Sequence, residues 1–100
     1  MGGQVIVVVE RKKVEMKLLG VITTDDELVR EIFQMEDGNI FIKGESDIHM
    51  RMDFDDDGNI DWLEWNGGPY IYTGEDFHGL GKVESITTED TGVILKVNNK

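Results

Sequence analysis

Apolar residues recur at every second position along most of this chain, a spacing that places alternate side chains on opposite faces of a β-strand. The clearest alternating segment runs from Ile48 to Asp55. Turn-forming residues separate it from segments of similar character. These other predicted strands are Gln4–Glu10, Val14–Ile22 with a bulge at Gly20, Ile40–Ile42, Ile60–Trp65, Tyr70–Thr73, Lys82–Thr87 and Gly92–Val97. The pattern predicts an antiparallel meander.

Residues 24–38 fit two predictions. Thr24 and Glu27 form a capping box, and the apolar residues from Leu28 to Phe33 then fall on one helical face. Alternatively, Asp37-Gly38 is the turn of a β-hairpin that pairs Met35 with Ile40 and Phe33 with Ile42. The capping box favours the helix. We therefore expect one α+β domain over residues 1–100, mainly an antiparallel β meander of about six to eight strands with one short helix near residues 25–36.

The sequence DFDDDGNIDWLE, residues 53–64, matches the calcium-loop pattern D-x-[DN]-x-[DN]-G-x5-E at every position. Within these residues it resembles an EF-hand loop, in which oxygen ligands surround a calcium ion and the last acid is bidentate. The resemblance assigns the metal ligands to Asp53, Asp55, Asp57, Asn59, Asp61 and Glu64.

The flanking sequence does not fit an EF-hand, which needs a helix on each side of the loop. The segment before the loop alternates like a strand, and Gly67-Gly68-Pro69 soon follows Glu64. The alternative is a β-hairpin with the three-residue loop Asp56-Asp57-Gly58, in which Phe54 faces Ile60, Met52 faces a buried Trp62 and no metal is needed.

The formal net charge of the chain is −11. The chain contains no cysteine. Residues 1–20 hold four Lys or Arg and two acids, whereas residues 21–100 hold six bases and nineteen acids. This field repels nucleic acid and anionic lipid and attracts basic proteins or divalent cations. We expect no membrane segment and no signal peptide, because the apolar run Val5–Val9 is too short for either, and so a cytoplasmic location.

Catalytic signatures are weak. There is no thiol, no serine stands in a nucleophile motif and no pair of carboxylates is singled out, so we do not expect an enzyme. The aromatic residues near the acidic loop are more informative, because aromatics anchor protein interfaces. The candidate partner-binding residues are Asp55, Asp56, Asp57, Trp65, Tyr70, Glu75 and Asp76.

The leading functional hypothesis is a small acidic protein-interaction module that binds a basic protein surface. Inhibitors and immunity proteins, including those of phages and bacteria, are of similar size and charge, and some use carboxylates in place of nucleic-acid phosphates. The second hypothesis is a calcium-binding module that uses residues 53–64. No cofactor is required by the first hypothesis, and Ca²⁺ is the ion named by the second.

Overall fold

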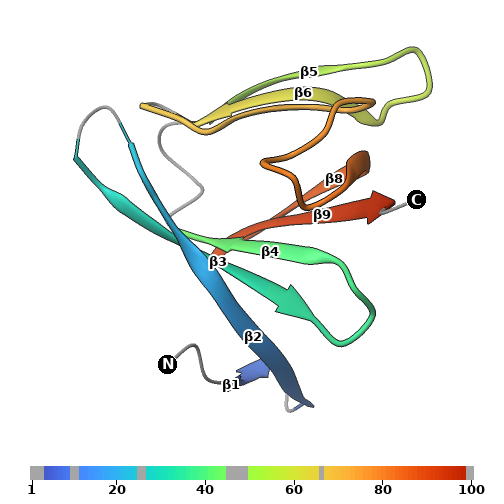
Figure 1. Ribbon diagram of the computed structural model, residues 1–100. Helices are drawn as coiled ribbons and strands as arrows, with labels where there is room; N and C mark the ends of the chain where they lie inside the picture. The colour runs from blue at the N-terminus through green and yellow to red at the C-terminus, as the bar shows by residue number, and fades with distance from the viewer. Residues whose placement is uncertain (1–3, 10–11, 25–26, 45–49, 66, 99–100) are drawn as a thin grey trace.

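Regular structure in this protein is β-strand throughout the part of the chain that the computed structural model describes, residues 4–9, 12–24, 27–44, 50–65 and 67–98. The strands, labelled in Figure 1, are β1 (Gln4–Val9), β2 (Lys12–Thr23), β3 (Val29–Met35), β4 (Ile40–Lys43), β5 (Met50–Phe54), β6 (Ile60–Trp65), β7 (Tyr70–Tyr72), β8 (Lys82–Glu89) and β9 (Gly92–Asn98). None of the described segments is a helix that could cross a membrane.

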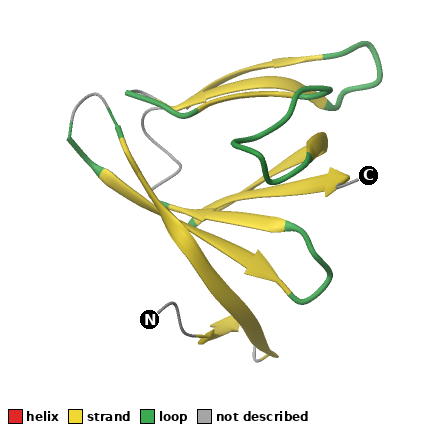
Figure 2. Cartoon of the chain, in the orientation of Figure 1, coloured by secondary structure: helices red, strands yellow, loops and turns green. Residues whose placement is uncertain are grey.

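Two antiparallel sheets lie one over the other (Figures 1 and 2). The larger sheet has the order β1-β2-β3-β4-β9-β8, and the smaller has the order β5-β6-β7. The smaller sheet is therefore an insertion in the chain between β4 and β8. Because β4 pairs with β9, the larger sheet is continuous despite this insertion.

The main core lies between the two sheets. The larger sheet contributes aliphatic residues such as Ile42 and Val93, and the smaller sheet contributes Leu63, Trp65 and Ile71. Each of these side chains is at most 1 % exposed. A three-stranded sheet buries little apolar surface alone, so its stability depends on this packing.

Strand β4 is buried on both faces. Ile40 and Ile42 face the main core, whereas Phe41 packs in a second cluster with Phe33 and Met16 on the opposite face of the larger sheet. Phe33 and Phe41 are directly paired across β3 and β4, with ring centroids 6.3 Å apart.

The predicted helix near residues 25–36 is wrong, and with it the α+β class, because residues 29–35 form strand β3. Thr24 does cap a turn, but its hydroxyl oxygen accepts a hydrogen bond from the Leu28 N–H (3.0 Å) inside the β2–β3 connection. Glu27 has a φ of 67°, which is not helical. Ile32 and Phe33 suggested a helix because both faces of this strand are buried, which hides the period of two.

The alternative hairpin at Asp37-Gly38 is the structure that forms, with a different register from the one predicted. Met35 donates to the carbonyl of Asn39 (2.8 Å), so the loop has three residues and Phe33 pairs with Phe41. The predicted bulge at Gly20 is confirmed by the register shift between Leu18 and Gly20. Of the strand predicted from Ile48, the structure describes Met50–Phe54 as β5, and Ile48 and His49 lie outside the described residues.

Candidate functional site

The acidic segment 53–64 forms the β5–β6 hairpin, with one strand entering the loop and one leaving it. The Asp55 N–H donates to the Asn59 carbonyl at 2.8 Å, and the Gly58 N–H donates to the Asp55 carbonyl at 3.0 Å. Gly58 has a φ of 85°, as the last position of such a three-residue loop requires. The predicted hairpin and its loop are therefore confirmed.

The carboxylate of Asp55 closes this turn. Its Oδ1 accepts hydrogen bonds from the backbone N–H groups of Asp57 and Asn59, both at 2.9 Å. The sequence Glu36–Ile40 (EDGNI) recurs twenty residues later as Asp56–Ile60 (DDGNI), and it forms a similar turn: Gly38 has a φ of 89°, and Met35 and Asn39 make the corresponding backbone hydrogen bond. The recurrence thus reflects the requirements of one turn type used twice.

The proposed calcium ligands are spread along the hairpin. Glu64 is salt-bridged to Arg51 of β5, with Oε1 and Nη2 2.8 Å apart. Glu64 lies four positions beyond Ile60, which stands beside the turn, and this separation is roughly 13 Å at about 3.3 Å per residue. Among the residues that the structure describes, no three His or acidic side chains are placed to share a metal ion.

A bulge in β6 decides which aromatic residues face outward. Asp53 pairs with Trp62, but the next residue, Phe54, pairs with Ile60, so Asp61 is an extra residue in β6. The predicted Phe54–Ile60 pair is confirmed, although Phe54 is 60 % exposed. The predicted Met52–Trp62 pair is wrong.

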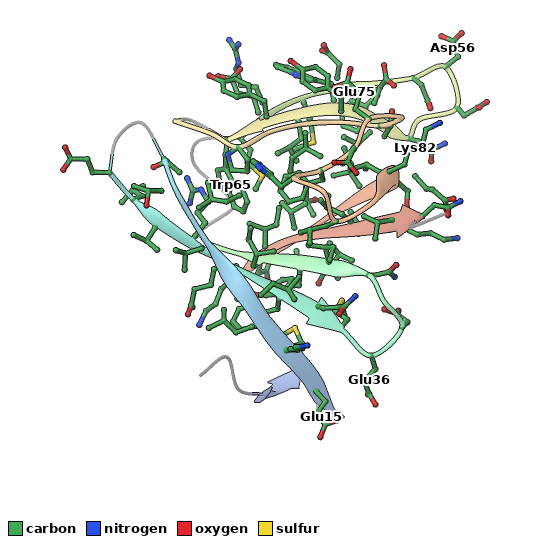
Figure 3. The ribbon with its side chains drawn as sticks, in the orientation of Figure 1. Glu15, Glu36, Asp56, Trp65, Glu75 and Lys82 are labelled. Atoms are coloured by element: carbon green, nitrogen blue, oxygen red, sulfur yellow. The ribbon has the colours of Figure 1, made fainter. Side chains whose placement is uncertain are left out.

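Because of the bulge, the predictions for the two tryptophans are wrong: Trp62 was expected to be buried and Trp65 to bind a partner, and the structure exchanges these positions. Met52 pairs with Leu63, and Trp65 is the residue that is fully buried (0 % exposed). Figure 3 shows Trp65 between the two sheets. Trp62 is half-buried on the outward side of β6. The sequence carried a signal for this change, since Ile60 and Leu63 cannot belong to one uninterrupted alternation.

The outer face of the small sheet consists of two rows of side chains, each crossing β5, β6 and β7. One row is Arg51–Glu64–Tyr70 and the other is Asp53–Trp62–Tyr72. Tyr70 and Tyr72 are 51 % and 44 % exposed, so both rows end in an accessible aromatic ring.

The second row borders an open, shallow groove of about 460 Å³. Its lining residues are Asp53, Asp61, Trp62, Tyr72, Thr73 and Glu75. Asp61 is held in place because the Thr73 hydroxyl donates to its Oδ1 at 2.9 Å and the Thr73 backbone N–H donates to its backbone carbonyl at 3.2 Å. The groove therefore combines two aromatic rings with three carboxylates.

Most of the predicted partner-binding residues lie on this layer of the molecule. Asp55, Asp56 and Asp57 are exposed at the hairpin tip, and Glu75 lies in the groove. Figure 3 shows Asp56 and Glu75 on the small-sheet side of the molecule. Asp76 points to a different depression, beside Lys82. Sequence reasoning missed Trp62, Tyr72, Asp53 and Asp61 as parts of one surface, because the bulge and the β6–β7 pairing bring them together.

No protein-family model matches the sequence, and neither a curated protein nor a solved structure matches it. The geometry of the outer face is therefore the basis for a functional proposal.

Proposed function

We propose that the protein is an acidic protein-interaction module that binds a basic protein surface through the outer face of the β5–β7 sheet and the adjoining hairpin tip. The observation that carries this proposal is the accessible aromatic row beside a dense set of carboxylates. Acidity alone would keep the protein dispersed in water, but accessible tyrosine rings beside a half-buried tryptophan are typical of interface anchors.

The charge of this region favours a basic partner. Residues 50–76 contain eight carboxylates and only one guanidinium, that of Arg51. The guanidinium is already paired with Glu64. A partner that carries positive charge is steered toward such a surface, and the partners that fit include proteins whose basic surface normally holds nucleic acid. Nucleic acid itself is repelled.

A defined basic probe tests the proposal: a synthetic peptide in which Arg and Gly alternate, compared with a Glu-Gly peptide of equal length. We expect the basic peptide to bind and the acidic one not to bind. The association rate should fall steeply as NaCl rises, because steering charges act through a screened field. Stopped-flow fluorescence of the half-buried Trp62 measures the rate.

Two charge-matched double variants locate the binding face. Asp56→Asn with Asp57→Asn removes two charges at the hairpin tip, and Glu15→Gln with Glu36→Gln removes two at the opposite end of the molecule (Figure 3). We expect the tip variant to slow association several-fold and the distant variant to have little effect. Equal effects of the two variants, or binding that ignores salt, would contradict the proposal and would place the contact elsewhere, for example on residues 4–19.

A further inference from the structure

The two rows on the outer face of the small sheet differ in one respect that points to a ligand. In the first row, the acid Glu64 has a cation beside it, because Arg51 pairs with Glu64 at 2.8 Å. In the second row, β5 supplies Asp53 at the corresponding position; Asp53 pairs with Trp62, and Trp62 pairs in turn with Tyr72. The second row therefore has the acid and the aromatic rings but no cation of its own.

The aromatic pair in the second row is partly open to solvent. The ring centroids of Trp62 and Tyr72 are 6.2 Å apart and their planes are inclined by 42°. Tyr72 is 44 % exposed. Both residues line the groove, so a group bound in it can contact both rings, and the electron-rich face of each ring attracts a positive charge.

The carboxylates around the rings give the groove one sign of charge. Asp53, Asp61 and Glu75 line it, and no Lys or Arg does. Asp61 keeps a fixed position through its hydrogen bonds with Thr73, so one acid is preorganised. A neutral apolar group would leave these carboxylates without a partner, and an anion would be repelled, whereas a cation satisfies both the acids and the rings.

The main core of the same protein already contains an arginine stacked on a tryptophan ring. The guanidinium of Arg30 lies over the Trp65 ring, 4.2 Å from its centroid. A planar guanidinium can stack on a ring and also donate two parallel hydrogen bonds to a carboxylate, which an ammonium group cannot do. The groove therefore suits arginine better than lysine.

We propose that the groove lined by Trp62 and Tyr72 receives a single arginine side chain of the basic partner protein. This inference rests on the proposed function and adds a defined anchor to it: the hairpin tip steers the partner, and the groove holds one guanidinium.

The test uses a Lys-Gly peptide that carries a single central arginine, and an otherwise identical peptide in which citrulline, an uncharged isostere, replaces that arginine. The indole N–H signals of both tryptophans are followed by NMR. We expect the Trp62 signal to shift on binding of the arginine-containing peptide and the signal of the buried Trp65 to stay in place. Replacing the anchoring arginine should weaken binding on the order of tenfold.

Variants of the two rows provide the matched control. Tyr72→Leu should weaken binding of the Arg-Gly peptide several-fold, and Tyr70→Leu, in the row that already holds Arg51, should weaken it clearly less. Trp62→Phe keeps an aromatic ring and should retain most of the affinity. Retained binding by this conservative variant shows that the groove tolerates substitution without unfolding. If Tyr72→Leu binds as tightly as the unmodified protein with the same salt dependence, the groove is not the anchor, although the basic-partner function stands. If no basic peptide binds the unmodified protein, the proposed function itself fails.

Discussion

At the tip of the β5–β6 hairpin, a single carboxylate does structural work that the calcium-loop pattern would assign to a metal ligand. Asp55 Oδ1 accepts hydrogen bonds from the backbone N–H groups of Asp57 and Asn59. The side chains of Asp56 and Asp57 are then the acids that project from the turn. The motif therefore separates into residues that build the turn and residues that carry its charge.

Replacing Asp55 tests this separation. Asp55→Ala removes both hydrogen bonds, and we expect the free energy of unfolding to fall by about 1 kcal/mol, as for the loss of a helix cap. Asp55→Asn keeps an acceptor oxygen and should recover most of that loss. Asp56→Ala should stay within about 0.5 kcal/mol of the unmodified protein, since Asp56 is exposed. Urea unfolding measures all three, and equal losses for Asp55→Ala and Asp56→Ala would contradict the assignment.

Residue-level prediction from sequence succeeded where the cause is local. The three-residue loop with Gly58 at the left-handed position was predictable, because few residues adopt that conformation. The exposure of Trp62 and the burial of Trp65 were not predicted, since they depend on the extra residue in β6 opposite Asp53 and Phe54. A bulge of one residue reverses the faces of every later side chain in the strand.

At the scale of elements, the helix prediction failed at β3 because the competing hydrogen bonds are non-local. The capping-box residues are real turn residues, but β3 pairs with β2 on one edge and with β4 on the other. Backbone pairing on both edges, together with burial of Ile32 and Phe33 on opposite faces, outweighs a local preference for helix.

Arg30 links the two sheets through this same strand. It is 5 % exposed, its Nε donates to the Gly68 carbonyl at 3.2 Å, and its guanidinium covers Trp65. An arginine of the larger sheet thus contacts both β6 and the turn that follows β6. The smaller sheet is positioned by this contact as well as by apolar packing.

We expect Arg30→Met to lower the free energy of unfolding by about 2 kcal/mol, because the variant keeps apolar bulk but leaves the Gly68 carbonyl without this donor. Arg51→Met is the matched control, since its salt bridge to Glu64 lies on the surface and should be worth less than about 1 kcal/mol. Urea unfolding with matched slopes checks both. Equal losses would show that the Arg30 contact does not hold the sheets together.

At the scale of the whole molecule, charge was predictable from sequence and topology was not. Net charge is a sum over residues, so the acidic character of residues 21–100 required no fold. The pairing of β4 with β9 joins Ile42 to Val93 across the entire inserted sheet. No local pattern encodes such a pairing, because the paired strands lie on either side of the whole three-stranded insertion in the sequence.

The concentration of acids on one layer has a consequence for stability. Eight carboxylates on residues 50–76 repel one another, and this repulsion acts against the compact state. We therefore expect the melting temperature to rise with added NaCl, as screening shortens the range of the repulsion to about 10 Å at 0.1 M salt.

The same melts distinguish general screening from a specific calcium site on residues 53–64. Calcium and magnesium chloride at equal ionic strength should raise the melting temperature by equal amounts, because Asp55 is engaged in closing the turn and Glu64 is salt-bridged to Arg51 far along the hairpin. A larger rise with calcium, abolished by Glu64→Gln, would contradict this expectation, since a bidentate closing ligand is what calcium selectivity in such loops depends on. It would then follow that calcium reorganises the hairpin and breaks the Arg51–Glu64 pair. The comparison of the two melting temperatures thus tests whether the carboxylates of residues 53–64 bind calcium specifically.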